Sequence, residues 1–207
     1  VGISPALTRF SANLKTQGRH EKANSLIKTG IIFKLISSLL LALALIASSD
    51  AISTNILKRP EMGMFIKLAS LYLIGHSTYV AVNSAFIGLD KMQIAGLIMN
   101  IQAITKFDSS IFLILLGFAV SGAILGIGLG FAIAAMAGTT LTVSHVNANT
   151  VNDPSQRTGF FDDLKTMVSY GTPLYVSSMV LGILTQYRSL ILALFASSAE
   201  IGNYHTA

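Results

Sequence analysis

The sequence predicts an all-α integral membrane protein, a polytopic helical bundle. Of the 207 residues 52% are hydrophobic and only 11% are charged, and the mean hydropathy is +0.66. Soluble domains carry roughly 25% charged residues, so this chain has too few charges to cover a soluble surface of its size. It has no Cys, which excludes a disulfide scaffold, a thiolate zinc site and a cysteine nucleophile.

The net charge of +5 results from 14 Lys and Arg residues against 9 Asp and Glu residues. The basic residues do not form one patch, the chain has no Trp, and aromatic residues make up only 8%. This pattern does not favour a nucleic-acid partner, for which a basic stripe with stacking side chains is typical.

Long apolar segments define the expected elements in order. A spanning helix needs about 20 mostly apolar residues. Five segments reach that length: 25–48, 63–87, 92–116, 119–143 and 166–194. We expect residues 1–12 to end an earlier span and 199–207 to begin a later one, so that the chain is a fragment of a longer protein. The segments are too long and too continuously apolar for barrel strands, which alternate.

The expected connections between the spans are short and polar or rich in turn residues. They are 13–24, 49–62 with Lys58-Arg59-Pro60-Glu61, the tight turn 88–91, the turn 117–122, and the loop 144–163, in which Asn152-Asp153-Pro154-Ser155 is typical of a turn. None has the length or composition of a soluble domain.

The distribution of Lys and Arg predicts the orientation. One set of alternate connections holds Arg9, Lys15, Arg19, Lys22, Lys28, Lys91, Arg157 and Lys165. The other holds Lys58, Arg59 and, at a helix edge, Lys67. Because cytoplasmic loops carry the excess of basic residues, we expect the first set, with segments 13–24 and 144–165, in the cytoplasm. Lys34, Lys106 and Arg188 remain within predicted spans.

Lys106 is the clearest ionisable residue within a span. Gln102, Lys106 and Ser109 or Ser110 share one helix face. Asp108 lies about 200° around the helix from Lys106 at helical spacing, so the two should not pair. Lys106 could be neutralised by an acid on another helix, but we favour a cation that lines a cavity.

A second polar stripe contains Tyr72, His76, Tyr79 and Asn83 at the spacing of one helix face. His76 could couple movement to protons, because imidazole changes charge near neutral pH, and Asp108 is a second candidate for that role. A hydrogen-bonded interior histidine is the favoured alternative. Asn83 and the tyrosine hydroxyls equally fit a wall that contacts sugar.

In the last span Ser178, Gly182, Thr185 and Arg188 share a face. Arg188 could snorkel to the interface or line a cavity, and the residues do not decide between these. Pro173 could bend the helix or mark its first turn.

Other patterns indicate packing rather than chemistry. Gly122, Gly126 and Gly130 recur every fourth residue, which lets helices approach closely. No zinc-protease, nucleophile-elbow or phosphate-loop motif is present. The pair Asp162-Asp163 is expected at a helix start, where it complements the dipole, rather than at a metal. We therefore expect no catalytic residue, metal or cofactor.

Several stretches resemble polysaccharide-type flippases of the multidrug/oligosaccharidyl-lipid/polysaccharide exporter superfamily. They are ALTRF at 6–10, GRHEKA at 18–23, FIGLDKM at 86–92, LGF at 116–118 with Gly122-Ala123, YGTPL at 170–174 and AEIGNYHTA at 199–207. Each motif is loose, but their order and spacing extend over nearly the whole chain.

The resemblance implies a MATE-like transporter lobe running from late helix two to early helix eight of a protein with roughly twelve to fourteen helices. Residues 1–143 would belong to the first lobe, 144–165 to the cytoplasmic linker and 166–207 to the start of the second lobe. Arg9 and Lys106, with Arg188 as a third candidate, would attract the phosphates of a lipid-linked oligosaccharide, and Asn83 and Gln102 would contact the substrate. The sequence at 186–189, QYRS, departs from relatives that carry an acid there, which puts acid-dependent ion coupling in doubt.

The resemblance implies a flippase in the cell membrane that moves a polyprenol-linked oligosaccharide by alternating access, and we expect the full-length protein to be monomeric. A cation-coupled drug exporter of the same superfamily is the first alternative, and it would expect acids in the cavity. A membrane-embedded glycosyltransferase is the second, and it would need a carboxylate or metal site in a loop.

Overall fold

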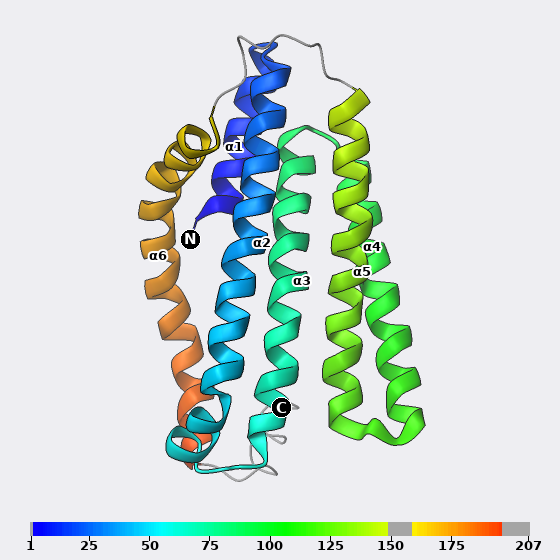
Figure 1. The fold of residues 1–207 in the computed structure, drawn as a ribbon, viewed down its shortest axis with the longest axis vertical. Coiled ribbons are helices and arrows are strands. Elements are labelled where there is room, and N and C mark those ends of the chain that lie inside the picture. The colour runs from blue at the N-terminus through cyan, green and yellow to red at the C-terminus, as the bar shows by residue number, and fades with distance from the viewer. Residues whose placement is uncertain (1, 149–158, 196–207) are drawn as a thin grey trace.

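The computed structural model describes residues 2–148 and 159–195, and these form helices joined by short turns (Figure 1). The elements are α1 (Ile3–Thr16), α2 (His20–Ala51), the π-helical turn η1 (Ile52–Ile56), α3 (Met62–Gly88), α4 (Met92–Leu113), the π-helical turn η2 (Ile114–Phe118), α5 (Ala119–Ala148) and α6 (Phe160–Phe195). The predicted all-α membrane class is confirmed.

Three stretches of the described residues are long and apolar enough to span a membrane: His20–Ile56, Met62–Gly88 and Met92–His145. The third stretch contains both α4 and α5, which fold back on each other as a hairpin (Figure 1). Gly117 has φ +90° and Ala119 has φ +44°, so the chain reverses there through the left-handed region. α6 is not among the three, and the predicted span 166–194 stays a prediction.

Two predicted connections are shorter than the sequence indicated. The segment 13–24 was expected to be a loop, but α1 continues to Thr16 and α2 begins at His20. Likewise 49–62 continues α2 to Ala51 and then forms η1. Serines there donate back to their own helix, with Ser49 Oγ to Ile46 O at 2.8 Å and Ser53 Oγ to Asp50 O at 3.0 Å. Polar side chains that bond their own helix in this way need not end it.

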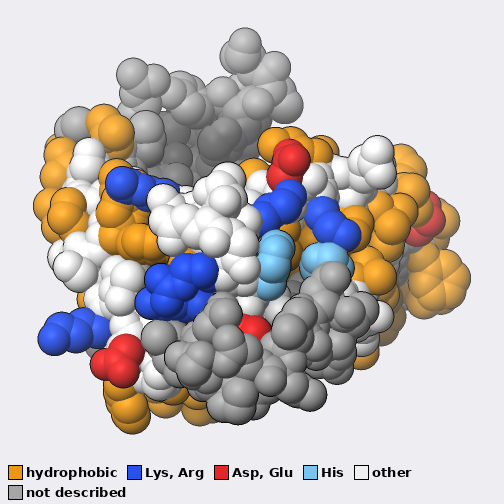
Figure 2. All heavy atoms as spheres, turned by 90° about the horizontal axis from the view of Figure 1, so that it is seen from above, with side chains coloured by type: hydrophobic (Ala, Val, Ile, Leu, Met, Phe, Trp, Pro, Cys, Tyr) orange, Lys and Arg blue, Asp and Glu red, His pale blue; other side chains and the backbone are white. Residues whose placement is uncertain are grey.

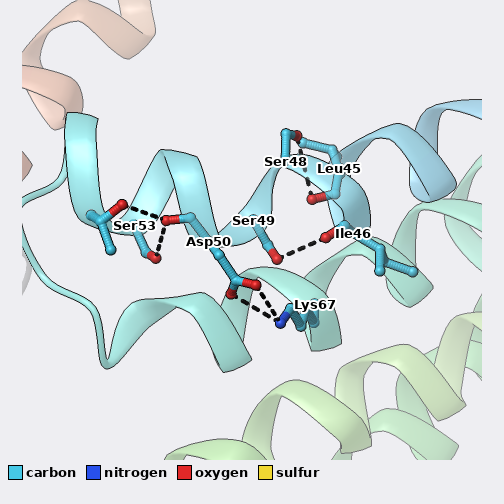
Figure 3. Close-up of polar contacts among 8 residues, drawn as sticks. Leu45, Ile46, Ser48, Ser49, Asp50, Ser53 and Lys67 are labelled. Atoms are coloured by element: carbon cyan, nitrogen blue, oxygen red, sulfur yellow. Dashed lines mark hydrogen bonds and ion pairs between the residues drawn. The ribbon is translucent and has the colours of Figure 1, made fainter.

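The end of α2 is tied to the start of α3 by an ion pair (Figure 3). Lys67 Nζ lies 2.9 Å from Asp50 Oδ1 and 3.0 Å from Asp50 Oδ2. Gly63 lies next to this ion pair, since a Cβ on Gly63 would be 3.1 Å from Asp50 Oδ1. Both charged side chains are substantially exposed, so the pair orients this end of the bundle more than it stabilises it.

The helices are arranged around α2 and α3. α5 packs against α3 and α4 on one side, whereas α6 packs against α1 and α2 on the other (Figure 1). One buried cluster joins α1, α2 and α6 through Leu7, Ile27 and Met167. A second joins α3, α4 and α5 through Phe86, Ile98 and Ala134.

α6 differs in two ways from the expectations at its start. Pro173 lies well inside the helix, so the first-turn alternative is wrong, and a bend at Pro173 stays a prediction. Asp162 and Asp163 are in the first turn as expected, but Asp163 is also buried and accepts a hydrogen bond of 2.7 Å from Ser25 Oγ of α2. The acid therefore attaches α6 to α2 in addition to complementing the dipole.

Glycines set the distance between α4 and α5, as the sequence predicted. A Cβ on Gly130 would lie 2.8 Å from Lys106 Cα, and one on Gly126 would overlap the backbone of Ser110. Gly128, between them on another face, has open space around it.

Gly126→Ala should destabilise the protein by about 1–3 kcal/mol, because the added methyl forces α4 and α5 apart. The measurement is the thermal unfolding of the purified protein in detergent. Gly128→Ala is the matched control and should be neutral or more stable by about 0.5–1 kcal/mol, since the methyl meets no atom and stiffens the helix. Equal destabilisation by both variants would contradict the close contact at Gly126.

Candidate functional site

A pocket with polar groups in a mainly apolar lining lies between α2, α3 and α6, at the middle of α2 and α3. Its volume is about 410 Å³. Its lining consists of Phe33, Lys34, Ser37, Ser38 and Leu41 from α2, Leu73, His76, Ser77 and Val80 from α3, and Tyr175 from α6. The lining combines a cation, an imidazole and hydroxyls with apolar walls, and no carboxylate is among its described residues.

Lys34 supplies the charge of this pocket. It lies in the middle of α2 and is half-buried, and neither of the ion pairs found in the described residues includes it. The neighbouring hydroxyls donate to backbone carbonyls, with Ser37 Oγ to Phe33 O at 2.7 Å and Ser77 Oγ to Lys34 O at 3.4 Å. Their lone pairs can accept further bonds, so the pocket offers both donors and acceptors.

His76 is held by aromatic rings on its other side. Its ring centroid lies 5.1 Å from that of Tyr72 and 5.0 Å from that of Phe131 in α5. Tyr79 meets the same phenylalanine at 5.2 Å. The shared helix face predicted for these side chains is therefore present for three members, and it packs on α5. His76 lies where this cluster borders the pocket.

Asn83 and Gln102 are placed outside the pocket lining. Asn83 Oδ1 and Gln102 Nε2 are buried, and neither has a hydrogen-bond partner among the described residues. A buried amide without a partner is costly, so a water molecule or a polar ligand would be favourable at each. Their assignment to substrate contact stays a prediction.

Lys106 and Asp108 lie on the exposed surface of α4, and neither lines the pocket. The ion pairs of the described residues do not include them, in line with their expected separation around the helix. Ser109, on the predicted polar stripe with Lys106, donates to Gly126 O at 3.1 Å. That stripe therefore partly faces α5, and the proposed roles of Lys106 and Asp108 stay predictions.

Arg9 belongs to the contact between α1 and α6. Its guanidinium carbon lies 4.5 Å from the ring centroid of Tyr170, and the ring of Phe10 meets the same tyrosine at 5.5 Å. Next to Tyr170, the backbone of Gly171 meets that of Gly2, since a Cβ on Gly171 would lie 2.6 Å from Gly2 O. Two of the stretches singled out in the sequence, ALTRF and YGTPL, thus contact each other.

The structure does not bring Arg9, Lys106 and Arg188 to one described site. Arg9 is at α6 and Lys106 is at α5. The backbone of Arg188 continues α6, but its side chain lies outside the described residues, as do residues 149–158 of the loop 144–163.

Lys34 is recognisable in the sequence as a cation within a predicted span, but it was not expected to line a site. The signal was present, because Lys34, Ser37, Ser38 and Leu41 follow helical spacing and share a face. That stripe lies within a long apolar helix, and only the neighbouring α3 and α6 show that it lines a cavity.

Comparison with known protein families gives a match over the whole chain. The family model described as polysaccharide biosynthesis protein matches residues 1–207. No curated protein and no solved structure matches the chain significantly.

The pocket should be open to water, and the absence of cysteine from the chain makes this measurable. Ser37→Cys should react with a water-soluble maleimide in intact vesicles, because thiolate forms only where water reaches the sulfur. Ile36→Cys is the control, since Ile36 is exposed but lies outside the pocket lining. Faster labelling at position 36 than at position 37 would mean that the pocket is closed to water.

Proposed function

The chain belongs to the polysaccharide biosynthesis protein family, and from that premise we propose that it forms part of a flippase. The substrate is a polyprenol-linked oligosaccharide, which moves across the cell membrane for the assembly of a surface polysaccharide or glycan. The protein makes and breaks no bond. It acts as a monomer, and segments 13–24 and 144–165 lie in the cytoplasm.

The observation that carries the proposal is the cationic pocket between α2, α3 and α6. A lysine held among apolar helices is costly unless a negative charge approaches it. The phosphate of a lipid-linked sugar supplies such a charge, and the attraction is stronger in a pocket of low dielectric than in water. The hydroxyls of Ser37, Ser38 and Ser77 suit a sugar, which both donates and accepts hydrogen bonds.

The arrangement of the pocket supports alternating access. Lys34 and His76 come from the proposed first lobe (1–143), whereas Tyr175 comes from α6 of the proposed second lobe (166–207). Pro173 lies two residues before Tyr175 and removes a backbone hydrogen bond from α6. Movement of α6 relative to α2 and α3 then switches the access to the pocket from one side of the membrane to the other.

The two alternative functions differ in the charge that they need. A drug exporter that takes up cations favours carboxylates, and the lining of this pocket has lysine and histidine instead. A glycosyltransferase that uses the same lipid needs a base or metal beside the sugar. The same reconstituted protein can test all three functions.

Lys34→Glu should lower the rate of flipping at least tenfold, because the reversed charge repels the phosphate; tenfold corresponds to about 1.4 kcal/mol. The assay reconstitutes the complete protein in liposomes and follows a fluorescent diphosphate-linked oligosaccharide leaving one leaflet. Lys58→Glu makes the same charge change in an exposed turn between α2 and α3 and should flip at the normal rate.

Full flipping activity of Lys34→Glu would show that the phosphate of the substrate does not bind in this pocket. Uptake of a cationic dye without lipid movement would identify a drug exporter, and transfer of sugar to an acceptor would identify a glycosyltransferase.

Lys106→Glu tests the cation that the sequence selected. If Lys106 holds phosphate in the complete protein, its reversal should abolish flipping while the protein still inserts, which membrane fractionation measures. Normal flipping by this variant would leave Lys106 as an exposed cation of α4. The Lys34 and Lys106 variants lie on different helices, so each result can be interpreted separately.

A further inference from the structure

A second basic pocket lies at the end of the bundle where α2 begins and α5 ends, away from Lys34. Its volume is about 210 Å³, well above the ~30 Å³ that one water molecule occupies in the liquid. Its polar lining comes from separate elements: Lys15 of α1, His20 and Asn24 of α2, Lys91 of the turn between α3 and α4, and His145 of α5. Figure 2 shows basic side chains and histidines gathered on this end of the molecule.

The two lysines are held in place by neighbouring groups. Lys15 Nζ donates to Leu89 O at 2.7 Å, and Lys91 Nζ lies 3.4 Å from His145 Nδ1. Asp90 reaches Lys15 only at 3.9 Å, and its side chain is 83% exposed. The Asp90 carboxylate is therefore largely in water, and it neutralises Lys15 only weakly.

Asn24 provides an independent sign of a ligand. Its side chain is 7% exposed, it lines the pocket, and Nδ2 has no hydrogen-bond partner among the described residues. A buried amide N–H without an acceptor loses its hydration without compensation. An acceptor oxygen in the pocket would satisfy it and would meet the lysines at the same time.

We propose that this pocket binds a phosphate group through Lys15, Lys91 and Asn24, at a site separate from the transport pocket. A phosphate group carries negative charge and several acceptor oxygens, which match two ammonium donors and one amide donor. The group belongs either to an anionic lipid at the membrane surface or to a free phosphate ion. The proposal stands whether or not Lys34 binds the transported lipid.

The test for free phosphate is the unfolding temperature of the purified complete protein in detergent. Phosphate should raise Tm in a saturable way at constant ionic strength, with chloride as the reference, because a ligand that binds the folded state stabilises it. The test for lipid is native mass spectrometry after exposure to phosphatidylglycerol or phosphatidylcholine, in which only the anionic lipid should be retained.

Two variants and one matched control make the test specific. Lys91→Gln should weaken binding about tenfold, as expected for loss of a charge-assisted hydrogen bond. Asn24→Leu removes the amide at similar size and without changing the charge, and it should also weaken binding. This variant keeps the test decisive if Lys91→Gln disturbs the turn between α3 and α4. Lys28→Gln removes the same charge from an exposed position of α2 outside this pocket and should bind normally.

If phosphate raises Tm of the unchanged protein but not of the two variants, the site is supported and a free phosphate ion is enough to fill it. Retention of phosphatidylglycerol alone, lost in the same variants, supports the site with a lipid headgroup as ligand. Binding of neither probe overturns the proposal. An equal loss in Lys28→Gln overturns it as well, because the effect would then be one of net charge.

Discussion

Close approach of helix backbones is the constraint on which this bundle depends. In lipid no hydrophobic force presses apolar helices together, so they associate where small residues allow many van der Waals contacts. Here a Cβ on Gly75 would lie 2.9 Å from Ala132 N, which joins α3 to α5. Gly130 does the same for α5 and α4, and Gly171 for α6 and α1. These contacts fix the spacing of α3, α4 and α5 on one side of the bundle and of α1 and α6 on the other.

Much of the fold could be predicted from the sequence because span length is a strong physical requirement. Each apolar run of about 20 residues became a helix, and the turn at Asp90 and the reversal at Gly117 lie where turn residues occur. Helix ends were less predictable. Serines such as Ser49 and Ser53 look like loop residues in a sequence, yet they bond to carbonyls of their own helix and continue it.

The candidate site was only partly visible in the sequence. Periodicity along α3 placed His76 on a face with Tyr72 and Tyr79, and the ring contacts with Phe131 bear this out. Periodicity cannot show which face of one helix meets which face of another. Lys34 and Lys106 both lie within long apolar segments. Lys34 lines a pocket between three helices, whereas the side chain of Lys106 is exposed and its backbone packs on Gly130 of α5. The packing of α3 and α6 against α2 distinguishes the two lysines.

The hairpin of α4 and α5 has a consequence for how the protein enters the membrane. From Ser109 to Ser144 the sequence contains no Asp, Glu, Lys or Arg. The reversal between the helices is itself apolar, and Leu115 and Leu116 are exposed there. Carrying this turn through the hydrocarbon layer moves no charge out of water, so the largest barrier to crossing is absent. The two helices can therefore insert together as one unit during synthesis. The turn between them needs no charged residue to keep it on the far side of the bilayer.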